Sequence, residues 1–349
     1  MMQIHSFEHQ KYISIFRWIS FLFIFIAHSR WGLSVPTVFK SSSFHLTNYI
    51  ALATDCFFIL SGFLLIKYFK NPPHFFRYLQ KRFLHLIIPC FLFWICFQGM
   101  SFLNLIHVDL LKGWKDIFGL NVFGVPWYHN DMNYTWFCYA LFWSNLLFIS
   151  LFYYKKAFYF ILPLLIILSG YTVLSNFSHE RLIVWQPYSY IPLSMGSYRG
   201  IFCVGLGFLT ALIKEYTTHL KINYFILTFL EGLILFIFGL TIKFMEPIWI
   251  YLLGLISLCL LLFLLSKKNS LGYHITNRSL PDVFSKYLLG AYLFSSIAFL
   301  TMNLVTKTYP FLFFYGSYIL LFSFLLSLFY GFICFKISEF IKTLILKKS

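Results

Sequence analysis

The sequence predicts an all-α, polytopic integral membrane protein with about ten transmembrane helices. Composition is the first reason: 60% of the 349 residues are hydrophobic and only 11% are charged, whereas soluble domains carry about 25% charged residues. The second reason is that the apolar residues form continuous runs of about twenty residues, the length that an α-helix needs to cross a bilayer core. A transmembrane β-barrel would instead show short segments of alternating polarity.

Each apolar run is expected to cross the bilayer once, and short polar connections separate the runs. The chain 1–349 is therefore expected to form a single membrane domain, with spans from about residue 12 to 335 and no separate soluble domain. The expected spans are 12–33, 49–69, 84–102, 136–154, 157–174, 199–213, 223–242, 247–265, 287–305 and 311–335.

The basic residues predict the orientation of these spans. With the N-terminus in the cytoplasm, 18 of the 27 lysines and arginines fall in inner segments and 8 in outer segments, and Arg17 lies within the first span. This bias follows the positive-inside rule. We therefore expect both termini in the cytoplasm, and the formal net charge of +16 is explained by topology rather than by a nucleic-acid partner.

The cysteines and the first apolar run argue against a cysteine metal site and against a removable signal peptide. The seven cysteines lie in or beside apolar runs and form no CxxC pair, so we expect buried packing residues and no metal site. The first run is too long for a removable signal peptide and has no cleavage site.

Arg17 and His28 form the most informative pair, because both lie in the first expected span with ten residues between them. Ionisable groups inside a span are costly to insert and indicate a functional site. The helical rise places them roughly 16 Å apart along the axis and on nearly the same side. A ligand that enters the bilayer from one side can therefore touch both residues.

Asp55 is the candidate partner of His28, because it lies near the outer end of the second span, at a similar depth. A carboxylate beside an imidazole fixes its tautomer and raises its basicity, which suits a general base. The alternative is that Asp55 pairs with a neighbouring helix or caps a span beginning at Cys56. The adjacent Ser61-Gly62 pair is expected to allow close helix packing.

A basic segment before the third span carries Arg77, Lys81, Arg82 and His85. On a helix these spacings place the side chains on neighbouring faces, and guanidinium groups grip phosphate oxygens in bidentate fashion. The alternative is a juxtamembrane patch that meets anionic lipid and sets topology.

Three blocks in this order, Arg17-x10-His28, DCFFILSGFLL and FFRYLQKRFLHLIIP, resemble the bacterial membrane acyltransferase-3 family. The stretches that begin at Thr135, Arg199 and Ser285 are similar to the family's later segments. The resemblance covers about residues 8–335 and implies ten spans around one catalytic domain.

The resemblance implies an enzyme that O-acylates, usually O-acetylates, a surface polysaccharide or lipopolysaccharide precursor in the bacterial inner membrane. It implies acyl-CoA, with acetyl-CoA as the expected donor substrate, and no permanently bound cofactor. The basic segment and Arg17 would hold the donor, and His28, oriented by Asp55, would deprotonate the acceptor hydroxyl or carry the acyl group itself.

The sequence departs from the family at three positions. His85 replaces the second arginine of an Arg-x-x-Arg pair, so that contact is titratable or comes from Arg77 or Lys81. The glutamate that many members carry after the tryptophan of span four is absent. Many members also have a histidine directly after a late Tyr-Leu pair, and here Tyr292-Leu293 is followed by Phe294-Ser295. These departures concern donor affinity and acceptor class.

The acceptor is expected to be a surface glycan or a lipid-linked oligosaccharide, and Trp136, Trp127 and Tyr128 are candidates to stack on its sugar rings. The alternative is that these residues belong to an interfacial aromatic belt. The rival function is a glycolipid transporter, or a polymerase of surface polysaccharide assembly. A protein with that function is also polytopic and basic, but it needs no phosphate-binding cluster beside Arg17 and His28.

Overall fold

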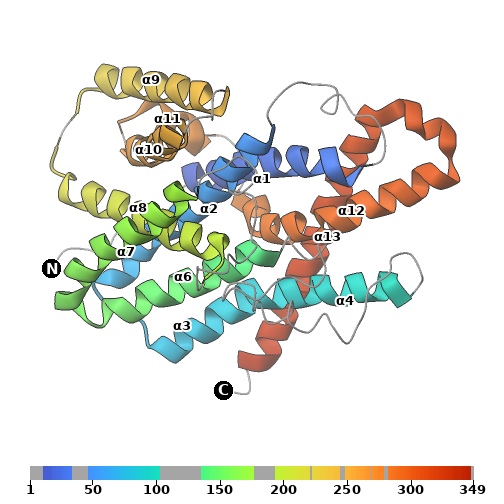
Figure 1. Ribbon diagram of the computed structural model, residues 1–349, viewed down its shortest axis with the longest axis horizontal. Coiled ribbons are helices and arrows are strands. Elements are labelled where there is room, and N and C mark those ends of the chain that lie inside the picture. Colours follow the sequence, from blue (N-terminus) through green and yellow to red (C-terminus); the bar gives the residue numbers. More distant parts are fainter. Residues whose placement is uncertain are drawn as a thin grey trace.

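The computed structural model describes residues 11–33, 46–102, 135–176, 193–220, 222–243, 248–267, 269–278 and 282–346. Every regular element within these ranges is a helix (Figure 1), which confirms the predicted all-α class. Nine of the described helical segments are long and apolar enough to cross a membrane, and α6, with 17 residues, is a shorter apolar helix. The chain is therefore a multi-pass membrane protein.

The helices follow the expected spans closely in order and position. Short π and 3-10 turns connect several of them. The elements are α1 (Lys11–Gly32), α2 (Leu46–Phe69), α3 (Phe75–Arg82), π turn η1 (Phe83–Ile87), α4 (Ile88–Phe102), α6 (Trp136–Phe152), α7 (Lys155–Ser175), α8 (Met195–Tyr216), α9 (Tyr224–Lys243), α10 (Ile248–Leu265), α11 (Leu271–Arg278), 3-10 turn η4 (Asp282–Tyr287), α12 (Leu288–Thr308), 3-10 turn η5 (Pro310–Tyr315) and α13 (Gly316–Leu346).

Helices α2 and α8 form the centre of the bundle, and two glycines let their backbones touch. A Cβ atom on Gly62 would lie 1.9 Å from the carbonyl oxygen of Val204, and one on Gly207 would lie 1.9 Å from that of Ile59. Small residues at a helix interface permit such close approach inside a membrane. The expected role of Ser61-Gly62 in helix packing is therefore confirmed for Gly62.

Gly62→Ala and Gly207→Ala should each destabilise the protein, because the added methyl group has to push two backbones apart. Overpacking of this kind costs about 1–3 kcal/mol. Thermal unfolding in detergent measures the loss. Gly232→Ala is the matched control, since a Cβ there meets nothing within 4 Å, and it should unfold at or above the wild-type temperature. Equal unfolding temperatures for all three variants would contradict the close contact between α2 and α8.

The peripheral helices present large apolar side chains outward. Phe160 on α7 is 76% exposed and Phe225 on α9 is 78% exposed, and both helices lie at the edge of the bundle (Figure 1). In a bilayer these apolar side chains meet lipid instead of water, so their exposure has no free-energy cost. These helices therefore form part of the lipid-facing shell.

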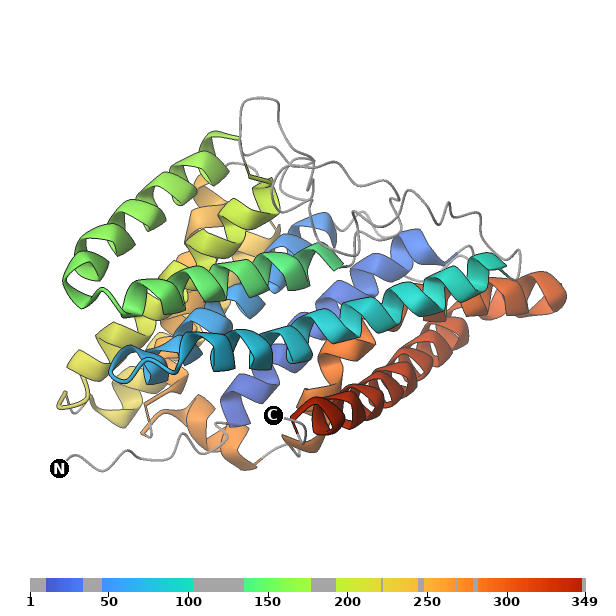
Figure 2. The ribbon, with the colours of Figure 1, turned by 90° about the horizontal axis from the view of Figure 1, so that it is seen from below.

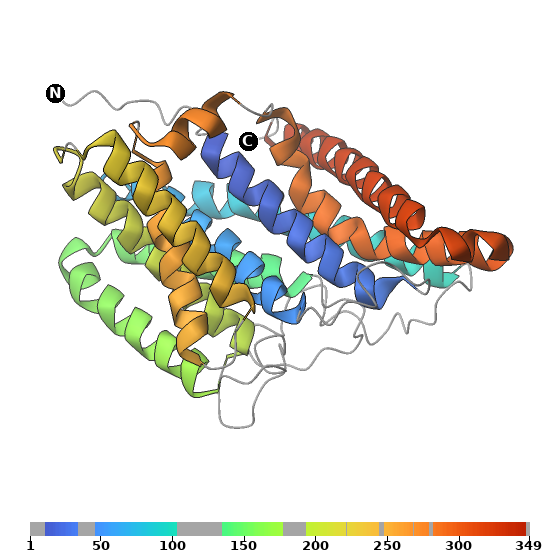
Figure 3. The same ribbon diagram turned by 90° about the horizontal axis from the view of Figure 1, so that it is seen from above.

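One side of the bundle gathers the beginning of α1, the end of α13, helix α11 and turn η4 (Figures 2 and 3). The described chain thus begins and ends on the same side. Lys67 at the end of α2 and Lys286 in η4 line one pocket together with residues of α1 and α13. This side corresponds to the face that the charge bias predicts to be cytoplasmic.

Two expected boundaries are corrected by the structure. The basic segment is part of one helical run from Phe75 to Phe102, because α3, η1 and α4 follow one another without a break. The last expected span, 311–335, begins with the turn η5 and continues as α13 to Leu346. Residues 336–346 contain neither glycine nor proline, the residues that most disfavour a helix, and Lys342 pairs with Glu339 one turn earlier.

Candidate active site

A basic pocket of about 240 Å³ is lined by residues near the beginning of α1 and the end of α13. Six of its lining residues are lysine or arginine, and they come from α1, α2, α3, η4 and α13. Its lining residues are Arg17, Leu64, Lys67, Tyr68, Lys81, Arg82, Leu84, His85, Pro89, Lys286, Leu289, Gly290, Cys334, Phe335, Ser338, Glu339 and Lys342. The arrangement is suited to an anion that several cations hold at once.

The local geometry before α4 explains how His85 reaches this pocket. Pro89 has no N–H to donate to the carbonyl of His85, four residues earlier. The helix widens there into the π turn η1, in which the N–H of Ile88 bonds to the carbonyl of Phe83. Single π turns often mark functional sites. Here the turn presents His85 to the pocket together with Arg82.

The Arg82 side chain is held in place by an aromatic neighbour. Its Nε donates a 2.8 Å hydrogen bond to the hydroxyl of Tyr78, and the guanidinium lies 5.3 Å from the centre of that ring. Tyr78 is itself buried and packs edge-on against Tyr68 at 5.3 Å. The terminal nitrogens of Arg82 are therefore oriented before any ligand binds.

Four of the five expected donor-binding residues meet in the basic pocket: Arg17, Lys81, Arg82 and His85. The fifth, Arg77, is exposed and does not line the pocket, so its expected place in this site is corrected. It lies five residues before Arg82, more than a full helical turn away.

Sequence reasoning missed three cations of the basic pocket. Lys67, Lys286 and Lys342 line it, but the sequence indicated only their side of the membrane. They come from the ends of α2 and α13 and from η4, up to 275 positions apart in the chain. Only the charge bias toward the inner side could have pointed to them.

His28 lies on α1, in an aromatic environment at the other end of the helix from Arg17. Its ring centre is 6.1 Å from that of Tyr292 on α12. Tyr292 in turn packs edge-on against Phe137 at 5.9 Å. The side chain of Asn303 donates a 2.7 Å hydrogen bond to the carbonyl of Gly32, which fixes the end of α1 against α12.

The contact between α1 and α12 connects His28 with the basic pocket. Leu289 and Gly290 at the beginning of α12 line the pocket beside Arg17. Half a turn further along the same helix, Tyr292 is the neighbour of His28. Helices α1 and α12 therefore carry both residues that line the pocket and the two rings of the His28–Tyr292 contact.

Asp55 is not placed against His28, and the expected pairing of the two is corrected. Its Oδ1 accepts hydrogen bonds from Arg199, at 3.1 Å from Nε and 2.8 Å from Nη2. Its Oδ2 accepts a 2.8 Å bond from the hydroxyl of Tyr251. The Asp55 side chain is completely buried and that of Arg199 is 3% exposed. The carboxylate thus ties α2 to α8 and α10.

Arg199 was expected at the outer boundary of its span, whereas the structure has it buried one turn inside α8. It also donates to the carbonyl of Ala51 at 3.0 Å. Its charge explains the position of Asp55, because a buried carboxylate needs a partner that compensates for lost hydration. The alternative expectation for Asp55, that it pairs with a neighbouring helix, therefore agrees with this contact.

Trp136 begins α6 and covers the buried ion pair. The Arg199 guanidinium lies 5.6 Å from the centre of its ring, and the ring is 6.1 Å from that of Phe137. Trp136 therefore belongs to the same aromatic group as Tyr292 and His28. Trp127 and Tyr128, the other expected acceptor-binding residues, lie outside the described residues.

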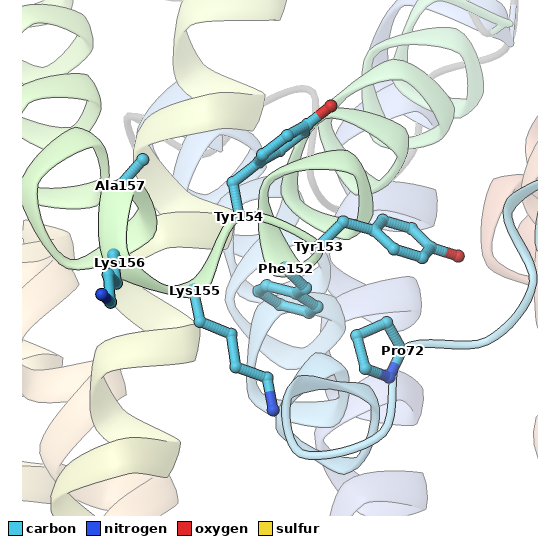
Figure 4. Close-up of a pocket in the computed structure, with 7 residues that line it drawn as sticks. All are labelled: Pro72, Phe152, Tyr153, Tyr154, Lys155, Lys156 and Ala157. Atoms are coloured by element: carbon cyan, nitrogen blue, oxygen red, sulfur yellow. The ribbon is translucent and has the colours of Figure 1, made fainter.

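A second hollow of about 590 Å³ lies at the turn between α6 and α7, with Pro72 on its rim. Figure 4 shows Tyr153, Tyr154 and Lys155 pointing in different directions rather than toward one point. Lys155 Nζ already donates to the carbonyl of Lys70 at 3.3 Å. This hollow is larger than the basic pocket, but its lining residues include neither a converging group of cations nor a histidine.

Comparison with known proteins places the chain in a family. Residues 10–336 match the model of a family described as an acyltransferase domain, the acyltransferase-3 family. Neither the curated proteins nor the solved structures gave a match. The match covers the described helices from α1 to α12, and α13 as far as residue 336. The chain therefore belongs to the acyltransferase-3 family and is a multi-pass membrane acyltransferase.

Proposed function

We propose that this membrane acyltransferase moves an acyl group, with acetyl as the expected one, from acyl-CoA to a hydroxyl of a surface polysaccharide or glycolipid precursor. The basic pocket is the observation that carries the proposal. Six cations from five separate elements converge there, and CoA is a donor whose nucleotide end carries several phosphate charges. A patch that merely sets topology has no need of such convergence.

The position of the pocket supports a cytoplasmic donor. It lies on the side that the positive-inside rule assigns to the cytoplasm, where acyl-CoA is found. The acceptor then approaches from the outer side, where His28 lies, and both termini are cytoplasmic in a bacterial inner membrane. The acyltransferase family match removes the basis for the rival transporter or polymerase.

The length of the donor fits the distance between its two expected contacts. Arg17 lines the basic pocket, and His28 lies roughly 16 Å further along α1. Phosphates held in the pocket allow the pantetheine arm to run along α1 and α12. Its thioester then reaches the group formed by His28, Tyr292 and Trp136.

His28 is the proposed base. It takes the proton of the acceptor hydroxyl while the oxygen attacks the thioester carbonyl carbon; the C–S bond then breaks and the proton passes to the CoA thiolate. In the other route His28 attacks the thioester first and afterwards passes the acyl group to the acceptor oxygen. Both routes release one CoA for each ester formed.

The direct test is release of CoA from acetyl-CoA by the purified protein, with and without a cell-envelope glycan fraction. The proposal expects release that depends on the glycan fraction and matches incorporation of acetyl groups into it. Incorporation without CoA consumption, or no turnover with any short acyl-CoA, would refute the proposed donor.

Arg17→Ala and Arg82→Ala should weaken binding of acetyl-CoA more than binding of the glycan acceptor. Each lost contact between a charged group and a phosphate is expected to cost about 1.5–3 kcal/mol. Titration in detergent measures it. Lys336→Ala is the control, because this exposed lysine lies on α13 but outside the pocket. Unchanged affinity in both arginine variants would return the cluster to the lipid-patch interpretation.

A further inference from the structure

The last turns of α13 line the basic pocket although they lie beyond the family match. That match ends at residue 336, whereas Ser338, Glu339 and Lys342 line the pocket. They lie on the part of α13 that continues past the expected end of the last span. The pocket is therefore lined in part by residues that lie outside the matched range.

Glu339 is the one carboxylate among the described residues that line the pocket. Its Oε1 lies 3.0 Å from Lys342 Nζ, and the side chains are 44% and 38% exposed. The charges that act on His85 include those of Glu339 and Lys342 together with Arg17 and Arg82. The carboxylate thus stands among the phosphate-binding cations and is accessible to a ligand.

A carboxylate in an anion pocket opposes any ligand that consists of phosphate alone, because like charges at short range repel. It becomes favourable when the ligand also brings an O–H or N–H group, since hydrogen bonds to a charged acceptor are strong. The nucleoside part of CoA carries such groups, a ribose hydroxyl and the adenine amine. A phosphopantetheine donor lacks both, and its own hydroxyl and amide N–H groups belong to the pantetheine arm, which the proposed function places along α1 and α12.

We propose that Glu339 is a specificity-determining residue of the donor pocket, which selects a nucleoside-bearing donor by accepting a hydrogen bond from its ribose or adenine. This inference rests on the proposed function, since it takes acyl-CoA as the donor. Lys342 pairs with the carboxylate at 3.0 Å, and it can contact a phosphate once the nucleoside engages Glu339.

The test compares the affinities of acetyl-CoA and acetyl-phosphopantetheine, measured by titration of the full-length protein in detergent. In Glu339→Ala the affinity for acetyl-CoA should fall about tenfold or more, while that for acetyl-phosphopantetheine should stay the same or rise. Glu339→Gln keeps a carbonyl acceptor and should retain most of the preference for acetyl-CoA. Glu215→Ala is the control, because this carboxylate pairs with Lys70 at 3.2 Å outside the pocket.

The outcomes separate the two proposals. If Glu339→Ala raises both affinities alike, Glu339 only repels anions and the inference is wrong. If neither affinity changes, the Glu339–Lys342 pair is a surface ion pair, and again only the inference fails. If the wild-type protein binds neither compound, the proposed donor itself is wrong and the inference falls with it.

Discussion

His28→Ala is expected to lower the rate of CoA release about 10²–10⁴-fold, the contribution of a positioned general base, while the affinity for acetyl-CoA stays near that of the wild type. The reason is position: His28 lies beside Tyr292 and is not among the residues that line the basic pocket proposed to hold the phosphates. Steady-state release and a separate titration with acetyl-CoA distinguish the two effects.

His219→Ala is the matched control, because this histidine is exposed in the turn after α8. It should leave both rate and affinity unchanged. Activity of His28→Ala above a tenth of the wild type would refute the assignment of His28 as the base. A loss of affinity without a loss of maximal rate would move His28 to the donor-binding residues.

Asp55→Ala should strongly destabilise the fold, because it leaves the buried Arg199 guanidinium without its carboxylate. Removal of one partner of a buried ion pair costs about 3–5 kcal/mol. The same change also removes the acceptor of the Tyr251 hydroxyl. Thermal or denaturant unfolding in detergent should show the loss, and expression is expected to fall with it.

A triple variant separates this structural role from a catalytic one. Asp55→Leu, Arg199→Met and Tyr251→Phe together replace the polar groups by apolar ones of similar size. Such replacement of a whole buried group is often close to neutral for stability. The triple variant should therefore regain most of the lost stability and retain CoA release. A stable triple variant with a hundredfold lower rate would restore Asp55 as a partner of His28.

The sequence predicted the membrane spans well because hydropathy is a local property. The first span was expected at 12–33 and α1 is Lys11–Gly32; the seventh was expected at 223–242 and α9 is Tyr224–Lys243. Helix α13 continues past the expected end of the last span, because residues 336–346 are helical without being continuously apolar. Hydropathy marks where a helix leaves the membrane rather than where the helix ends.

Within the site, the sequence predicted contacts that lie close together in the chain. Arg82 and His85 are three residues apart, and one π turn brings both to the pocket. The partner of Asp55 could not be predicted in the same way, because Arg199 is 144 positions away. The carboxylate was matched with His28 by depth alone, and depth does not determine which neighbouring helix a side chain faces.

The central claim is that a donor held in the basic pocket runs along α1 and α12 to His28, and photo-crosslinking tests it most directly. Two CoA analogues are needed, one with an azido group on adenine and one with a diazirine in the acyl chain. Peptide mapping should find the first on α3 or the end of α13, and the second on α1 or α12 near His28 and Tyr292. Excess CoA should abolish both labels. Labelling by the acyl probe at the hollow between α6 and α7, or labelling that CoA does not displace, would contradict the claim.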